Sequence, residues 1–169
     1  MSLASSRALT IARPTVRALM VVNLLYALSI SILLGHSFFV TDWPDAVTVK
    51  IFPNAANGLR VLIVIGVLCA GIVHTVLRRL VAIIDSVRAG DPFTFENAKR
   101  LQIIAWSALA LEVLRISAIE TLKTVYTPPY KVAFAPWAFG AWLAIVLLFV
   151  LAGVFAQGAR MRADLEGTV

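Results

Sequence analysis

Residues 87–104 read VRAGDPFTFENAKRLQII, which is the sequence of a water-exposed turn between two helices. Gly90 stands where a residue in the left-handed conformation ends a helix, and Asp91 with Pro92 forms a typical turn pair. Thr94 is a favourable N-cap for the helix that follows. The stretch therefore predicts one helix that ends just before Gly90 and a second helix that starts directly after Thr94.

This turn lies in the middle of a very apolar chain. The 169 residues are 60% hydrophobic and 14% charged, with a mean hydropathy of +0.90, whereas ordinary globular chains are about 25% charged. Four apolar stretches are each long enough to cross a hydrocarbon core of ~30 Å as helices. They cover residues 15–39, 59–77, 101–122 and 137–157. Because backbone groups in lipid need partners within the protein, we expect an all-α, integral membrane four-helix bundle in a single domain, 1–169.

The second and third helices are predicted to extend beyond the membrane. The second span continues as an amphipathic helix to residue 89. A helix over 59–89 measures about 46 Å, so about 10–16 Å of it projects from the hydrocarbon core. The third helix starts at residue 95, ahead of its apolar run at residue 101, and overshoots in the same way. We expect a helical hairpin with the turn at its projecting tip.

The distribution of Lys and Arg predicts the orientation. If the N-terminus is cytoplasmic, 10 of the 15 basic residues lie inside, 4 lie outside, and Arg115 lies within the third span. Cytoplasmic segments carry the excess of Lys and Arg, so both termini, the hairpin and a tail over 158–169 are predicted on the cytoplasmic side of the membrane. The net charge of +6 then reflects topology and attraction to anionic lipid, and direct binding of nucleic acid is not expected.

Charged residues within the third span are the main chemical anomaly. Glu112 lies near mid-bilayer and Arg115 follows at helical spacing, and such residues face other helices because exposure to lipid costs roughly 2.5–3.5 kcal/mol. The predicted intramembrane polar cluster consists of Asn23, His74, Ser107, Glu112 and Arg115. Two interpretations stay open. The favoured one is a structural ion pair, and the alternative is the proton or cation site of a small, oligomeric, ion-coupled transporter.

The sequence gives no sign of enzymatic chemistry. It contains no P-loop, dinucleotide-binding, nucleophile-elbow, zinc-protease or paired-cysteine motif. His36 and His74 lie at depths roughly 20 Å apart, which is too far for the two axial ligands of one haem. Cys69 is the single cysteine. We therefore expect no catalysis, no cofactor and no metal.

Two stretches resemble a known family. VRAGDPFTFENAKRLQIIAW and the C-terminal VFAQGARMRADLEGTV are similar to the bacterial membrane family DUF2975, and the similarity extends over nearly the whole chain. The matching residues are Gly90, Pro92, Phe93, Thr94, Glu96, Asn97, Arg100, Leu101, Gly158, Arg162, Asp164, Glu166, Gly167 and Thr168. The family has no assigned activity, but its members are often encoded beside a small Cro-like helix-turn-helix regulator. The resemblance thus implies a membrane partner for a cytoplasmic DNA-binding protein.

Both stretches fall on the predicted cytoplasmic side. We therefore expect a regulatory or interaction protein that docks a cytoplasmic protein, such as a small helix-turn-helix transcription regulator, through the hairpin 87–101 and the C-terminal tail. The residues expected to contact this partner are Phe93, Thr94, Glu96, Asn97, Arg100, Arg162, Asp164 and Glu166. A hairpin tip that is merely a solvated connection is the other interpretation of the same residues.

Overall fold

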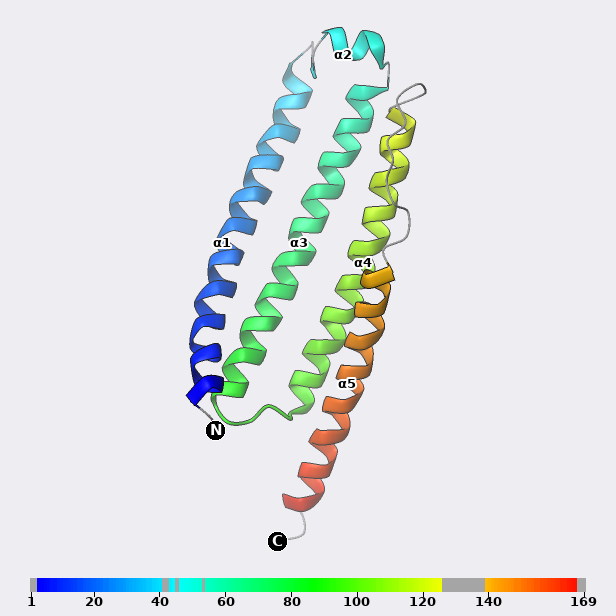
Figure 1. Ribbon diagram of the computed structural model, residues 1–169. Coiled ribbons are helices and arrows are strands. Elements are labelled where there is room, and N and C mark those ends of the chain that lie inside the picture. Colours follow the sequence, from blue (N-terminus) through cyan, green and yellow to red (C-terminus); the bar gives the residue numbers. More distant parts are fainter. Residues whose placement is uncertain (1–2, 41–42, 45, 53, 126–138, 167–169) are drawn as a thin grey trace.

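The computed structural model describes residues 3–40, 43–44, 46–52, 54–125 and 139–166. Within them the chain is all-α, with four long helices and one short one (Figure 1). The helices are α1 (Leu3–Phe39), α2 (Ala46–Ile51), α3 (Ala55–Arg88), α4 (Phe95–Val125) and α5 (Phe139–Glu166). The four long helices have the length and apolar composition of membrane spans, which confirms the predicted number of spans.

The long helices form an open row in sequence order (Figure 1). α1 packs on α3, α3 on α4 and α4 on α5, and no other pair of long helices in the described part of the chain packs together. The short turn between α3 and α4 makes those two helices antiparallel neighbours. The predicted all-α class and the four long helices are confirmed, and the described helices form a row in which α1 and α5 lie at opposite edges.

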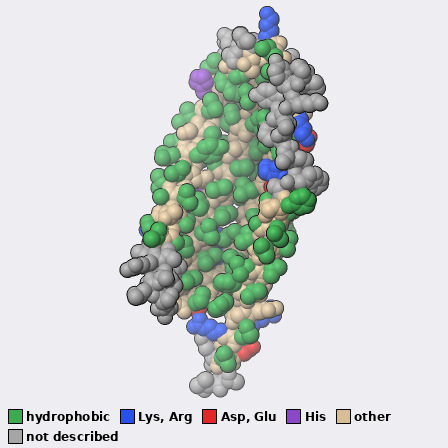
Figure 2. Space-filling model, in the orientation of Figure 1, with side chains coloured by type: hydrophobic (Ala, Val, Ile, Leu, Met, Phe, Trp, Pro, Cys, Tyr) green, Lys and Arg blue, Asp and Glu red, His purple; other side chains and the backbone are tan. Residues whose placement is uncertain are grey.

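Small residues are among the most buried side chains of the described helices. Ala70, Ala105, Ala152 and Ala159 are all buried, because small side chains allow helices in a membrane to approach closely. Many large apolar side chains are instead exposed, and they cover the face of the molecule that Figure 2 shows. This pattern suits a chain whose surrounding solvent is lipid.

The end of α3 confirms the predicted stop signal. Gly90 has a φ of 87°, in the left-handed region where only glycine is free of strain. The Gly90 N–H donates to the Val87 carbonyl and the Asp91 N–H donates to the Ser86 carbonyl, both at 3.1 Å. These two bonds are the Schellman pattern, which satisfies carbonyl groups at the helix end. The turn is consequently fixed by its own backbone.

The helices extend further than their apolar runs. α3 has 34 residues and measures about 51 Å, well above the ~30 Å of a hydrocarbon core. α5 continues without a break past Gln157 to Glu166, so the segment 158–169, predicted as a tail, is helical over its described part. Its residues include Ala, Arg, Met, Leu and Glu, which are strong helix formers whether apolar or charged. Residues 137–138 of the predicted fourth span lie outside the described residues.

The end of the row opposite the turn is held by Arg60. Its Nη2 donates to the Ser37 carbonyl at 2.5 Å, and its guanidinium lies 4.8 Å from the centroid of the Phe38 ring. Arg60 thus joins the start of α3 to the end of α1. The short helix α2 was not predicted, because six residues between turn-forming ones carry no readable period.

Candidate functional site

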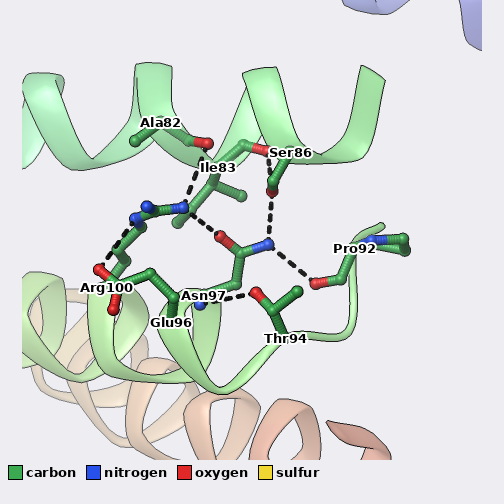
Figure 3. Close-up of polar contacts among 8 residues, drawn as sticks. All are labelled: Ala82, Ile83, Ser86, Pro92, Thr94, Glu96, Asn97 and Arg100. Carbon is green, nitrogen blue, oxygen red and sulfur yellow. Dashed lines mark hydrogen bonds and ion pairs between the residues drawn. The ribbon is translucent and has the colours of Figure 1, made fainter. Parts of the chain in front are cut away.

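Asn97 is the centre of a hydrogen-bond network where α3, the turn and α4 meet (Figure 3). Its side chain is fully buried. The Nδ2 group donates to Ser86 Oγ at 2.5 Å and to the Pro92 carbonyl at 2.9 Å. The backbone N–H donates to Thr94 Oγ1 at 3.1 Å, and Oδ1 accepts from Arg100 Nη1 at 2.8 Å. Both amide hydrogens and the amide oxygen of this side chain are therefore paired, and the predicted N-cap Thr94 is confirmed.

Arg100 connects this network to α3. Besides Asn97, its Nη1 has the Ala82 carbonyl as an acceptor at 3.4 Å. Its Nε lies 3.5 Å from Glu96 Oε1, which makes an ion pair across one turn of α4. That Nε is nevertheless buried and has no hydrogen-bond partner among the described residues. Arg100 is thus held firmly through one nitrogen and remains incompletely paired at another.

The C-terminal part of α5 is attached to the turn by two contacts. The rings of Phe93 and Phe155 lie with their centroids 5.1 Å apart, and Arg162 forms an ion pair with Asp91. Gly158 makes room for the first contact, since a Cβ atom there would lie only 2.9 Å from Phe93 Cδ1. The two stretches that carry the family resemblance are therefore adjacent in space.

The eight residues predicted to dock a partner divide into two groups. Those that hold the turn are Thr94, Asn97 and Arg100. Asn97 has no exposed surface and so cannot lie on the predicted docking surface. Those that remain exposed at the end of the row are Phe93, Glu96, Arg162 and Asp164. The side chain of Glu166 lies outside the described residues.

Two ionic contacts at this end were not predicted. Asp91 was interpreted only as a turn former, yet it also pairs with Arg162. Arg13 Nε lies 2.8 Å from Asp85 Oδ1, which joins α1 to α3. The second pair could have been found from the sequence, because Arg13 precedes the first span and Asp85 follows the second, so the two residues stand at the same membrane level.

The predicted intramembrane cluster is not assembled as one group. Glu112 is buried, and Arg115 donates to both of its carboxylate oxygens, from Nε at 2.8 Å and from Nη2 at 2.6 Å. Asn23 lies in another interface, where its Nδ2 donates to the Ala70 carbonyl at 2.9 Å. His74 has a buried Nδ1 without a hydrogen-bond partner among the described residues, and Ser107 is half-buried on α4.

The described part of the chain holds no group of three His, Cys, Asp or Glu side chains that could bind a metal ion. Its four long, apolar helices place the chain in the class of multi-pass helical membrane proteins. Within that class it belongs to the family described as "Protein of unknown function (DUF2975)", whose model matches residues 42–169. The match begins after α1, so the expected similarity over nearly the whole chain is too wide. No curated protein and no solved structure matches the chain.

Proposed function

We propose that this protein is a bacterial inner-membrane protein that performs no catalysis and docks a cytoplasmic protein on the surface formed by the α3–α4 turn and the end of α5. The observation that carries the proposal is the joining of these two segments. Residues about 70 positions apart are held together by the Phe93–Phe155 contact and the Arg162–Asp91 ion pair. A surface that is already rigid loses little conformational entropy when a partner binds.

The composition of this surface suits a protein partner. Phe93 is 45% exposed and Phe95 is 54% exposed, and together with Arg162 they line a cavity of about 220 Å³ between the turn and α5. The same two segments carry the exposed charged residues Glu96 and Asp164. Exposed aromatic side chains with a charged rim are the usual anatomy of a binding surface. A small helix-turn-helix regulator, implied by the resemblance to the family, is our preferred partner.

The orientation is part of the proposal. The N-terminus, the α3–α4 turn and the C-terminus lie at the same end of the row (Figure 1), and this end carries most of the Lys and Arg residues. The positive-inside rule then assigns this end to the cytoplasm. Cysteine labelling tests the assignment in a Cys69→Ser background. Met161→Cys should react with a membrane-impermeant maleimide only after cells are opened, whereas Phe39→Cys should react in intact cells with a permeable outer membrane.

Site-specific crosslinking tests the docking itself. A photoreactive residue at Phe95 or at Met161 should capture one defined cytoplasmic protein, and the same residue at Leu147, within the membrane span, should not. Glu96→Lys should abolish the capture. Its matched control is Glu120→Lys, which changes an exposed ion-paired glutamate at the other end of the same helix. Equal loss with both variants, or equal capture from Leu147, would reject the proposal.

The transport alternative is weaker. A carboxylate that binds and releases a transported proton or cation needs at least one oxygen free to accept it. In Glu112, both carboxylate oxygens accept hydrogen bonds from Arg115. We therefore propose that this pair is structural and neutralises its own charge within the membrane.

A further inference from the structure

A basic cavity lies on the row where α3 leaves the apolar part of its sequence. It has a volume of about 340 Å³ and is lined by Thr75, Arg78, Arg79 and Ala82 of α3 and by Arg100 of α4. None of the described residues that line it is acidic. The Thr75 hydroxyl donates to the Gly71 carbonyl at 3.1 Å, so the groups that remain to bind a ligand are the guanidinium groups. This volume is in the range of small-molecule binding sites in proteins.

The arginines of this cavity have unused binding capacity. Arg78 and Arg79 form no ion pair within the described part of the chain. Arg100 is oriented by Asn97, and its buried Nε has no hydrogen-bond partner there. Glu96 is the acid nearest to Arg100, at 3.5 Å, and its side chain is 54% exposed. Three guanidinium groups against one solvated carboxylate leave the cavity strongly positive, and guanidinium groups bind phosphate in a bidentate manner.

A second, apolar groove lies between α3 and α4, on the side of the cavity toward the apolar part of α3. The groove has a volume of about 490 Å³, and α3 contributes Leu68 and Ile72 to it. Leu68, Ile72, Thr75 and Arg79 follow one another at spacings of four, three and four residues, so they share one face of the helix. The other wall comes from α4 and includes Trp106, Ala110 and Leu114.

The dimensions of cavity and groove correspond to one leaflet of a membrane. Arg78 directly follows the apolar run 59–77, which places the cavity at the level of the lipid headgroups. From Arg79 to Leu68 the helix rises about 16 Å, and half of a ~30 Å hydrocarbon core is about 15 Å. A site with a basic end and an apolar groove of this length has the shape and polarity of a phospholipid.

We propose that this site binds an anionic phospholipid, with its phosphate in the cavity between Arg78, Arg79 and Arg100 and an acyl chain in the groove along α3 and α4. Basic pockets between membrane helices are suited to anionic headgroups. A zwitterionic lipid is disfavoured, because its ammonium group would bring a further positive charge to the three arginines. Since Arg100 also holds Asn97, an occupied site stabilises the α3–α4 turn.

Native mass spectrometry of the full chain in detergent tests this site. Phosphatidylglycerol should be retained, whereas phosphatidylethanolamine with the same acyl chains should not. The double variant Arg78→Gln/Arg79→Gln should bind phosphatidylglycerol at least tenfold more weakly. The matched control is Arg88→Gln/Arg160→Gln, which removes two exposed arginines at the same end of the molecule that do not line the cavity. It should retain the lipid at the wild-type level. Equal weakening in both double variants would reduce the effect to general surface charge and overturn the proposal.

Two further arms separate lipid from free phosphate and guard against misfolding. Millimolar inorganic phosphate should raise the thermal stability less than phosphatidylglycerol does, because it cannot occupy the groove. Equal stabilisation by both would overturn the lipid assignment. Ala110→Phe fills the groove and leaves every arginine in place, so it should weaken lipid retention several-fold while the far-UV circular dichroism stays unchanged. Unchanged retention in this variant would also refute the site.

Discussion

Replacement of Asn97 by alanine should loosen the end of the row more than any other single change to the turn. The substitution removes two neutral hydrogen bonds, to Ser86 Oγ and to the Pro92 carbonyl, and one bond from the charged Arg100. Neutral bonds contribute about 0.5–1.5 kcal/mol each and a bond to a charged group about 1.5–3 kcal/mol. The simple sum is about 2.5–6 kcal/mol. Because water reaches this end of the protein and replaces part of the loss, we expect about 3 kcal/mol.

The assay is equilibrium unfolding of the purified protein in mixed micelles, followed by helical circular dichroism. A loss of about 3 kcal/mol lowers the folding equilibrium constant by about 100-fold. Hydrogen exchange adds a local measurement, and amide protection over residues 86–97 should fall before that of the helix interiors. Asn97→Asp keeps an acceptor for Arg100 and loses both donors, so its effect should be intermediate.

The control variant is Asn57→Ala. Asn57 is also a helical asparagine, but it is exposed and has only one long contact, 3.5 Å from its Oδ1 to Arg60 Nη1. Its replacement should change the free energy of unfolding by less than about 0.5 kcal/mol. If Asn97→Ala lies within the same limit, the network in Figure 3 does not hold the turn and the reasoning fails.

Two further substitutions test the helix contacts. Gly158→Ala should lower the free energy of unfolding by about 1–2 kcal/mol, because the new Cβ meets the Phe93 ring. Gly140→Ala places its Cβ in open space and should raise the free energy of unfolding by up to about 1 kcal/mol in the same assay. A gain in stability at both positions would contradict the Gly158–Phe93 contact. Glu112→Leu should cost about 2–4 kcal/mol because it leaves Arg115 without its partner, and Glu112→Leu combined with Arg115→Leu should recover most of that loss. A double variant whose loss equals the sum of the two single losses would contradict the structural role of the pair.

Local signals in the sequence were sufficient for the turn. Gly90 and Thr94 act on backbone groups within a few residues of themselves, so their roles can be read without knowledge of the neighbouring helices. The same holds for Glu112 and Arg115, which are three residues apart on one helix. The number of spans was predicted because the length of an apolar run is also a local property.

The arrangement of the helices could not be predicted in this way. Lipid tails and buried helix faces are equally apolar, so hydropathy does not distinguish a side chain that faces a neighbour from one that faces lipid. Asn23 illustrates the consequence, since it was assigned to a common polar cluster and instead bonds to a backbone carbonyl at Ala70. The end of α5 was also missed, because α5 continues on helix-forming residues after its apolar run has ended.

The docking site stays a prediction, and the structure separates the roles of the residues assigned to it. Thr94, Asn97 and Arg100 belong to the family resemblance, and their hydrogen bonds give a structural reason for these residue types. A sequence motif alone does not distinguish buried residues that hold the turn in place from exposed residues that can contact a partner. The burial of Asn97 makes this distinction for one residue, and the exposure of Phe93 leaves another available to a partner.

The open row of helices also determines whether a single chain can form a pore for ions. The described helices stand one deep, each contacting only its neighbours in the row, so they have two faces and no lumen between them. A water-filled pore needs a closed wall. One chain could therefore form only one segment of such a wall. An ion pore would have to be enclosed by several chains that contact one another through their outer helices, α1 and α5.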